Sequence, residues 1–158
     1  MRVLQRKAKA ILNALDSPEG ELSLVLVDDV RIAQLNQAYL NHPGATNVIS
    51  FPMREGECNQ INPHLLGDVV ISMDTCAAEA AAAGLALEKR LDQLMIHGIL
   101  HLFGYDHVRN KTKARAMEAK SEALLALIDP QSVRSPAGLS TSRRATRKRA
   151  DRNPVSEG

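Results

Sequence analysis

Aromatic residues are scarce in this chain of 158 residues, which has no tryptophan, two tyrosines and two phenylalanines. Proteins that bind single strands of nucleic acid without sequence preference commonly stack the bases on aromatic side chains. The aromatic set is limited to Tyr39, Phe51, Phe103 and Tyr105, which can hardly supply such a platform. Any affinity for a polynucleotide must therefore come from backbone contacts, a bound ion or partner proteins.

Cysteine and long apolar runs are also scarce. Cys58 and Cys76 form no CxxC pair and lie far from the histidine-rich segment, so a disulfide framework is excluded and a reducing compartment is indicated. We expect each to be an ordinary packed or surface thiol. The first 17 residues begin basic but contain no unbroken apolar run of the kind that a secretory signal or a membrane span requires. We therefore expect a cytoplasmic protein with no membrane partner.

Positive charge is concentrated at the C-terminal end. Residues 131–158 contain 7 Lys/Arg and 2 Asp/Glu, whereas residues 1–130 contain 13 and 16. The last segment has too few large apolar residues to form a core, so we expect one domain over residues 1–130 and a basic, disordered tail over residues 131–158. Either the tail adds salt-sensitive attraction to a polyanion, or it is a solvated segment with no task.

The hydrophobic periodicity predicts an α+β (α/β-like) fold with a small mixed sheet packed against about five helices. Met95 and Met117 lie at helical spacing with leucines and are expected in the core. The expected helices cover residues 2–15, about 28–40 with Asp28 or Asp29 as the cap, a segment ending near 84, about 87–103 and about 111–128. The expected strands cover residues 21–27, 47–51 and 66–72.

Three of the five histidines lie in the segment HGILHLFGYDH at 97–107. His97 and His101 are four residues apart on an expected helix, so both rings project from one face. Gly104 can end that helix in the left-handed conformation and turn the chain back to present His107 to the pair. Three neutral imidazoles around one Zn²⁺ leave a fourth position for water, whose pKa can then be about 7. The alternative is three unrelated histidines.

The spacing HxxxHxxGxxH is that of the metzincin peptidases, but Gly98 stands where those enzymes carry a glutamate as general base. Without that carboxylate the peptide-hydrolysis mechanism loses its proton carrier. An ion with three neutral ligands keeps its full charge of +2, which suits an anionic reacting centre such as a phosphodiester. The sequence therefore disfavours a peptidase.

Other polar residues are weaker candidates. Asp106 could accept a hydrogen bond from a ligand imidazole, or it could cap the turn before the last helix. We expect Asp68 to be structural, and we expect His42 and His64 to be loop residues rather than ligands, although one of them could help to handle protons or phosphate.

Four segments together resemble the YbeY family of single-strand-specific metallo-endoribonucleases, also called rRNA maturation factors. The resemblance covers about residues 10–128, and Gly98 with the GYDH ending separates this family from the peptidases. The segments are LNQAYL at 35–40, TNVISFP at 46–52, LGDVVIS at 66–72 and HGILHLFGYDH at 97–107.

This resemblance implies a compact α/β fold with one zinc ion on His97, His101 and His107. It also implies cleavage of single-stranded RNA during maturation of the 16S rRNA 3′ end and in late ribosome quality control. The implied partners are 16S rRNA and the small ribosomal subunit, with no nucleotide cofactor. Beyond the metal-bound water it assigns no catalytic group.

The chain departs from the family pattern in several places. Leu40 follows Tyr39 where the family usually has an arginine, so a bidentate phosphate contact is missing there. The next loop reads NHPGAT, with His42 and Ala45 in place of the usual lysine and Pro-Thr pair. We expect either that the family's leading strand is absent or that the true start lies upstream, and the basic tail has no family counterpart.

Two alternative functions stay open at this point. The first is a non-catalytic ribosome-assembly factor with a structural metal, in which a fourth ligand such as Cys76 or His42 closes the coordination sphere. The second is another zinc hydrolase, including a peptidase, which needs a carboxylate from elsewhere in the chain to replace what Gly98 lacks.

Overall fold

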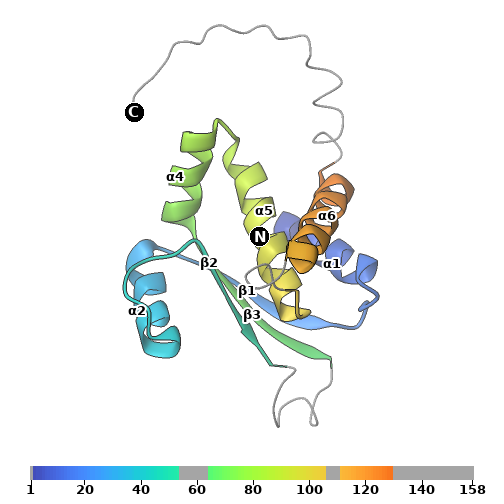
Figure 1. Ribbon diagram of the computed structural model, residues 1–158, viewed down its shortest axis with the longest axis horizontal. Helices are drawn as coiled ribbons and strands as arrows, with labels where there is room; N and C mark the ends of the chain where they lie inside the picture. Colours follow the sequence, from blue (N-terminus) through green and yellow to red (C-terminus); the bar gives the residue numbers. More distant parts are fainter. Residues whose placement is uncertain (1, 54–63, 106–110, 130–158) are drawn as a thin grey trace, which may run out of the picture.

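The computed structural model describes residues 2–53, 64–105 and 111–129 (Figure 1). This part of the chain contains three strands and five helices, which confirms the predicted α+β class and the predicted order of elements. The elements are α1 (Arg2–Ala14), β1 (Glu21–Val27), α2 (Asp29–Leu40), β2 (Val48–Pro52), β3 (Leu65–Ser72), α4 (Met73–Ala83), α5 (Leu87–Leu102) and α6 (Lys111–Ile128).

The sheet is mixed, with strand order β1-β3-β2. β1 runs parallel to β3, and β2 runs antiparallel to it. Gly67 lies in β3 where the β1–β3 register shifts, and its φ of +140° suits only glycine. A Cβ at this position would collide with the carbonyl oxygen of Phe51 on β2. Glycine is therefore required where the three strands approach each other at this end of the sheet.

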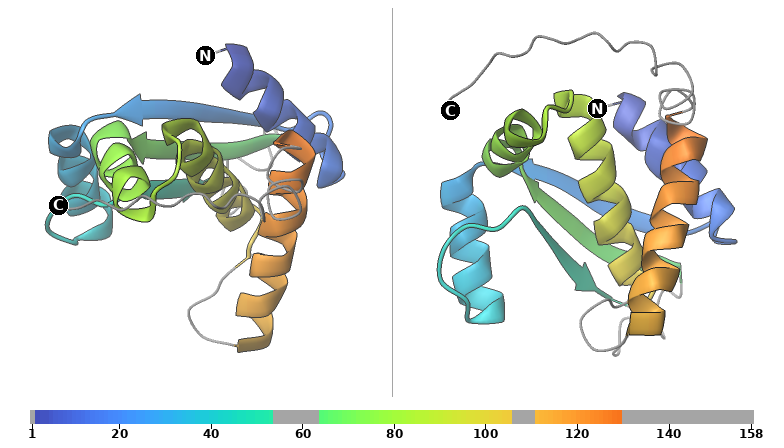
Figure 2. Two further views of the ribbon diagram at one scale, coloured as in Figure 1. Left: turned by 90° about the horizontal axis from the view of Figure 1, so that it is seen from above. Right: turned by 45° about the horizontal axis from the view of Figure 1, so that its top comes forward.

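Helices cover both faces of the sheet because apolar side chains of β3 alternate between them. Val69 and Ile71 are buried in the main core with α5, whereas Val70 packs with Ile49 and with Ile32 of α2 in a second, smaller cluster. Figure 2 shows α2 and α5 on different sides of the strands. Burial on two sides thus explains why residues 69–71 of β3 are all apolar.

α5 is the central helix of the fold, and it lies between α4 and α6 over the sheet (Figure 1). Nine of its sixteen residues are buried, including Met95, which is 0% exposed. Met117 of α6 is also buried, so both methionines belong to the core as predicted. None of the helices that the structure describes is long and apolar enough to cross a membrane. The burial of α5 holds its remaining polar stripe in a defined place.

An ion pair joins α1 to the middle of α5. Lys7 Nζ lies 2.8 Å from Oδ2 of Asp92, whose side chain is 3% exposed. Burial raises the pKa of the Asp92 carboxyl, and the hydrogen bond and charge of Lys7 oppose that rise. The lysine therefore offsets part of the cost of burying a carboxylate in α5.

The start of α2 is bound to the start of α4. Asp28 is the N-cap of α2 and accepts a hydrogen bond from the Arg31 amide. The next residue, Asp29, accepts hydrogen bonds of 2.6 Å from the hydroxyls of Ser72 and Thr75. These bonds lower the pKa of Asp29. Of the two predicted cap residues, Asp28 caps its own helix and Asp29 holds the first turn of α4.

Candidate metal centre and active site

His97 and His101 face each other one turn apart on α5. Their Nε2 atoms lie 3.0 Å apart, and their ring centroids are separated by 4.5 Å with the planes inclined at 74°. Both rings are half-buried between the helix and its neighbours. The structure therefore brings together the two histidines that the sequence predicted on one helix face, with the same nitrogen of each directed to a common point.

The distance between these nitrogens suits a shared cation. Two nitrogens that each lie about 2.0–2.1 Å from a tetrahedral Zn²⁺ are about 3.3 Å apart, within a few tenths of an ångström of the observed distance. A hydrogen bond from one Nε2–H to the other Nε2 has a similar length. The pair fits both a divalent ion and a shared proton.

A third ligand is not found within the described ranges, which contain no group of three or more histidine, cysteine or carboxylate side chains placed to hold a metal. The predicted third ligand, His107, and the predicted supporting carboxylate, Asp106, both lie outside these ranges. Their roles stay predictions.

The end of α5 has the geometry that the histidine segment requires. Gly104 has φ +92°, its amide donates to the carbonyl of His101, and the Tyr105 amide donates to the carbonyl of Leu100. This is a Schellman motif, which ends a helix with a left-handed residue. The predicted helix stop is confirmed, and the chain leaves α5 within one turn of His101.

Gly98 is fitted against the sheet. A Cβ at this position would lie 2.5 Å from Cγ1 of Val69, and the Ser50 hydroxyl donates to the Gly98 carbonyl at 2.7 Å. Position 98 therefore faces β2 and β3. A glutamate there, as in the metzincins, does not fit unless α5 moves away from the sheet. Close packing against the sheet thus explains why position 98 does not carry the glutamate that serves as general base in the metzincins.

The alternative metal ligands lie elsewhere. Cys76 is fully buried in the main core, and burial raises the pKa of its thiol, which disfavours the thiolate that binds metals. Within the described ranges, neither Cys76 nor His42 joins His97 and His101 in a group that could hold an ion. Nε2 of His64, near the start of β3, lies 3.4 Å from a carboxylate oxygen of Glu19. No closed coordination sphere forms from these residues.

A pocket of about 430 Å³ adjoins His97. It lies between α5, α6 and the segment that precedes β2. Arg90, Gln93 and His97 follow one stripe of α5, so the pocket continues from the histidine toward the start of that helix. The lining residues are Asn47, Arg90, Gln93, Leu94, Ile96, His97, Glu118, Ser121, Glu122 and Leu125.

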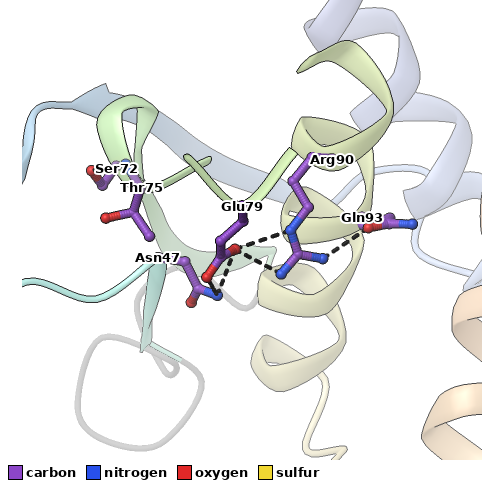
Figure 3. Close-up of polar contacts among 6 residues, drawn as sticks. All are labelled: Asn47, Ser72, Thr75, Glu79, Arg90 and Gln93. Atoms are coloured by element: carbon purple, nitrogen blue, oxygen red, sulfur yellow. Dashed lines mark hydrogen bonds and ion pairs between the residues drawn. The ribbon is translucent and has the colours of Figure 1, made fainter. Parts of the chain in front are cut away.

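A hydrogen-bond network shapes one wall of this pocket (Figure 3). Arg90 donates through Nε and Nη2 to Glu79 Oε1, at 3.0 and 2.8 Å, and through Nη1 to Gln93 Oε1 at 2.8 Å. Asn47 Nδ2 lies 3.2 Å from Oε2 of the same glutamate. The network ties α4, α5 and the segment before β2 together.

The same network sets the orientation of two amide groups. A guanidinium only donates, so the Gln93 oxygen must face Arg90, which leaves the Gln93 NH₂ for another partner. A carboxylate only accepts, so the Asn47 NH₂ must face Glu79. The network therefore uses the oxygen of Gln93 and the NH₂ of Asn47, and it leaves the Gln93 NH₂ free of this network.

The sequence analysis missed Glu79, Arg90 and Gln93. The signal that could have found two of them is the polar series at positions 90, 93, 97 and 101, which lies at helical spacing along an otherwise apolar helix. Glu79 lies on another helix, in an alanine-rich segment, and nothing in its local sequence distinguishes it from a solvated charge.

Comparisons with known proteins assign the chain to a family. A family model described as Endoribonuclease YbeY matches residues 1–129. The protein named Endoribonuclease YbeY from Syntrophotalea carbinolica is 49% identical over 129 residues, covering 81% of this chain and 86% of the relative. The protein of the same name from Geobacter sulfurreducens is 48% identical over 129 residues, with the same coverage.

A solved structure shares the fold. The solution structure of a protein from Thermotoga maritima aligns with a TM-score of 0.62 and 24% sequence identity, covering 91% of this chain and 89% of that one. At this identity the likeness supports the fold alone. The family model and the two relatives go further, and by them the chain belongs to the YbeY family.

Proposed function

We propose that this chain is a metal-dependent endoribonuclease that cleaves single-stranded RNA, with one zinc ion held by His97, His101 and His107. The observation that carries the proposal is the pair of Nε2 atoms 3.0 Å apart on α5. The relatives named Endoribonuclease YbeY support the reaction class, because the chain matches most of their length.

The protein supports this chemistry mainly by holding groups in place. A bound divalent ion neutralises charge on the phosphodiester and activates the attacking oxygen. The buried side of α5 holds both imidazoles rigidly, and neutral rings leave the charge of the ion uncompensated. Because His97 also lines the pocket, a substrate that enters the pocket lies beside the histidine pair. Asp106 is the candidate to orient a ligand ring.

The proposal extends to the biological substrate through the family resemblance. We propose that the enzyme acts in the cytoplasm on 16S rRNA, in maturation of its 3′ end and in late quality control of the small ribosomal subunit. Zinc is proposed because three histidine nitrogens are a common ligand set for catalytic zinc. Sets of imidazoles also bind Ni²⁺, Co²⁺ and Fe²⁺.

The test compares metal-loaded and metal-stripped full-length protein on single-stranded and duplex RNA of the same sequence. We expect the metal-loaded protein to cleave the single strand and the stripped protein to lose this activity, with recovery when zinc is restored. His101→Ala should lose most of the cleavage because it removes one of the paired nitrogens.

His64→Ala is the matched control, since this histidine lies by Glu19 and away from the pair, and it should keep the cleavage. Equal RNA loss in every preparation, including the stripped protein and His101→Ala, would indicate a contaminating nuclease and overturn the catalytic proposal.

A further inference from the structure

We propose that the pocket beside His97 is a nucleobase subsite that selects guanine next to the scissile phosphate, with Gln93, Glu118 and Glu122 as the specificity residues. This inference rests on the proposed function for the presence of RNA at the site. The hydrogen-bonding and charge pattern of the pocket carries the choice of base.

Away from the histidine pair, the charges of the pocket disfavour a phosphate group. The positive charge of Arg90 is already paired with Glu79 at 2.8 Å. Glu118 and Glu122 lie four residues apart on one face of α6, both are exposed, and in the part of the chain described by the structure neither takes part in an ion pair. An anion in this pocket would therefore face two carboxylates. An uncharged base is the part of a nucleotide that suits it.

The donors and acceptors of the pocket complement guanine. Arg90 holds the oxygen of Gln93, so the Gln93 NH₂ is available to donate to O6 of the base. A carboxylate of α6 can accept from the adjacent N1–H and N2–H groups, which only guanine presents together on its pairing edge. Unpaired RNA bases are commonly read through this edge. Adenine, cytosine and uracil each present one donor group there.

The size and the walls of the pocket agree with a single base. Its volume of about 430 Å³ lies within the range of about 300–1,000 Å³ that is usual for small-ligand sites. Leu94 of α5 and Leu125 of α6 supply apolar surface for the faces of the ring. Because His97 lines the same pocket, the base would belong to a nucleotide that flanks the reacting phosphate.

The test measures binding separately from cleavage. Zinc-loaded, ¹⁵N-labelled full-length protein is titrated with guanosine 5′-monophosphate and with inosine 5′-monophosphate, which lacks the N2 amino group. Neither contains an internucleotide bond, so neither can be cleaved. We expect the guanosine nucleotide to bind about tenfold more tightly, because one hydrogen bond to a charged acceptor is lost with inosine. The amide signals of Gln93, Glu118 and Glu122 should shift.

Glu118→Gln/Glu122→Gln should bring the ratio of the two affinities close to one, whereas Glu21→Gln, an exposed glutamate at the start of β1, should leave the ratio unchanged. Equal affinities in the unmodified protein, or shifts confined to other parts of the molecule, would overturn the subsite. A guanosine preference in a protein that cleaves no RNA would support the subsite and overturn the proposed function.

Discussion

The polar side chains in the two halves of α5 have different kinds of partner. In the first half, Arg90 is bound to Glu79 and Asp92 is bound to Lys7, so each of these two charges meets an opposite charge from another helix. In the second half, His97 and His101 direct the same ring nitrogen at each other over 3.0 Å. The charged side chains of the first half bind to other helices. The two imidazoles of the second half come from the same helix and contact each other.

This difference separates the structural role of the first half from the metal-binding role that we propose for the second half. Opposite charges satisfy each other and hold α1, α4 and α5 together. Two imidazole nitrogens at hydrogen-bond distance satisfy each other only if a proton or a cation lies between them, because neutral rings present one acceptor nitrogen each. The state of the histidine pair therefore depends on whether a proton or a cation lies between the two rings.

The largest expected effect comes from removing a member of the histidine pair. At a zinc concentration about 1,000 times Kd, a protein that binds zinc only when folded gains about 4.1 kcal/mol in its free energy of unfolding. We expect His97→Ala and His101→Ala to lose most of this gain in urea unfolding followed by circular dichroism. His42→Ala is the control and should keep the gain. A full zinc effect in both site variants would refute the ligand assignment.

The next effect comes from breaking the paired half of the helix. Lys7→Met leaves Asp92 buried without its partner and should cost about 2–3 kcal/mol, below the value of about 3–5 kcal/mol for fully buried pairs because Lys7 is 20% exposed. Lys7→Met/Asp92→Leu should recover much of this loss, since no buried charge remains. Zinc binding by the single variant should be unchanged. Failure of the double variant to recover would argue against the ion pair as the cause.

The loss in Lys7→Met should depend on pH in a defined direction. Burial raises the pKa of Asp92 in the folded protein, so between the unfolded value of about 3.9 and the folded value the native state holds more protons than the unfolded one. Stability from this group therefore falls as pH rises through that window. Removing Lys7 raises the folded pKa further, so the deficit should be largest near neutral pH and should shrink toward pH 4. A deficit independent of pH would contradict this account.

A substitution at Gly98 tests how closely α5 packs against the sheet between its two halves. Gly98→Ala places a Cβ against Val69 and should cost about 1–3 kcal/mol through overpacking. The same substitution should cost less when Val69 is also changed to alanine, and the difference in a double-mutant cycle measures the contact. An equal cost in both backgrounds would show that α5 does not press on β3 at this position.

The smallest effect comes from the helix-ending glycines. Gly84 and Gly104 both have positive φ, and a Cβ at either position meets nothing within 4 Å. Alanine at either position should therefore cost about 1 kcal/mol from the backbone conformation alone. Only Gly104→Ala should also weaken zinc binding, measured by competition with a chelator, because only it alters the path of the chain after His101. Equal zinc affinity in the two variants would argue against the folded-back third ligand.

Much of the fold could be predicted from the sequence. The strand Leu65–Ser72 and the helix Leu87–Leu102 were expected almost to the residue, because an apolar run, helical spacing and Gly104 are local signals. Which of Asp28 and Asp29 caps α2 was left open. The answer depends on Ser72 and Thr75 of another element, so no local signal could supply it.

Some residues of the candidate site could also be predicted from the sequence, and others could not. His97 and His101 could be predicted because four residues on a helix place two rings on one face. Glu79 and Asn47 could not, since their contacts join α4 and the segment before β2 to a helix elsewhere in the sequence. The role of Gly98 was recognised as a missing carboxylate, while its contact with Val69 required the packed sheet.

By itself, the sequence determined the periodic elements, the helix stop at Gly104 and the spacing of the histidines, because these depend on neighbours within a turn or two of the chain. Only the tertiary structure decided that Asp92 is buried, that position 98 faces the sheet, and that Gln93, whose oxygen accepts from Arg90, lines a pocket beside His97. Burial and hydrogen-bond orientation are set by groups distant in sequence, and these meet only when the helices pack.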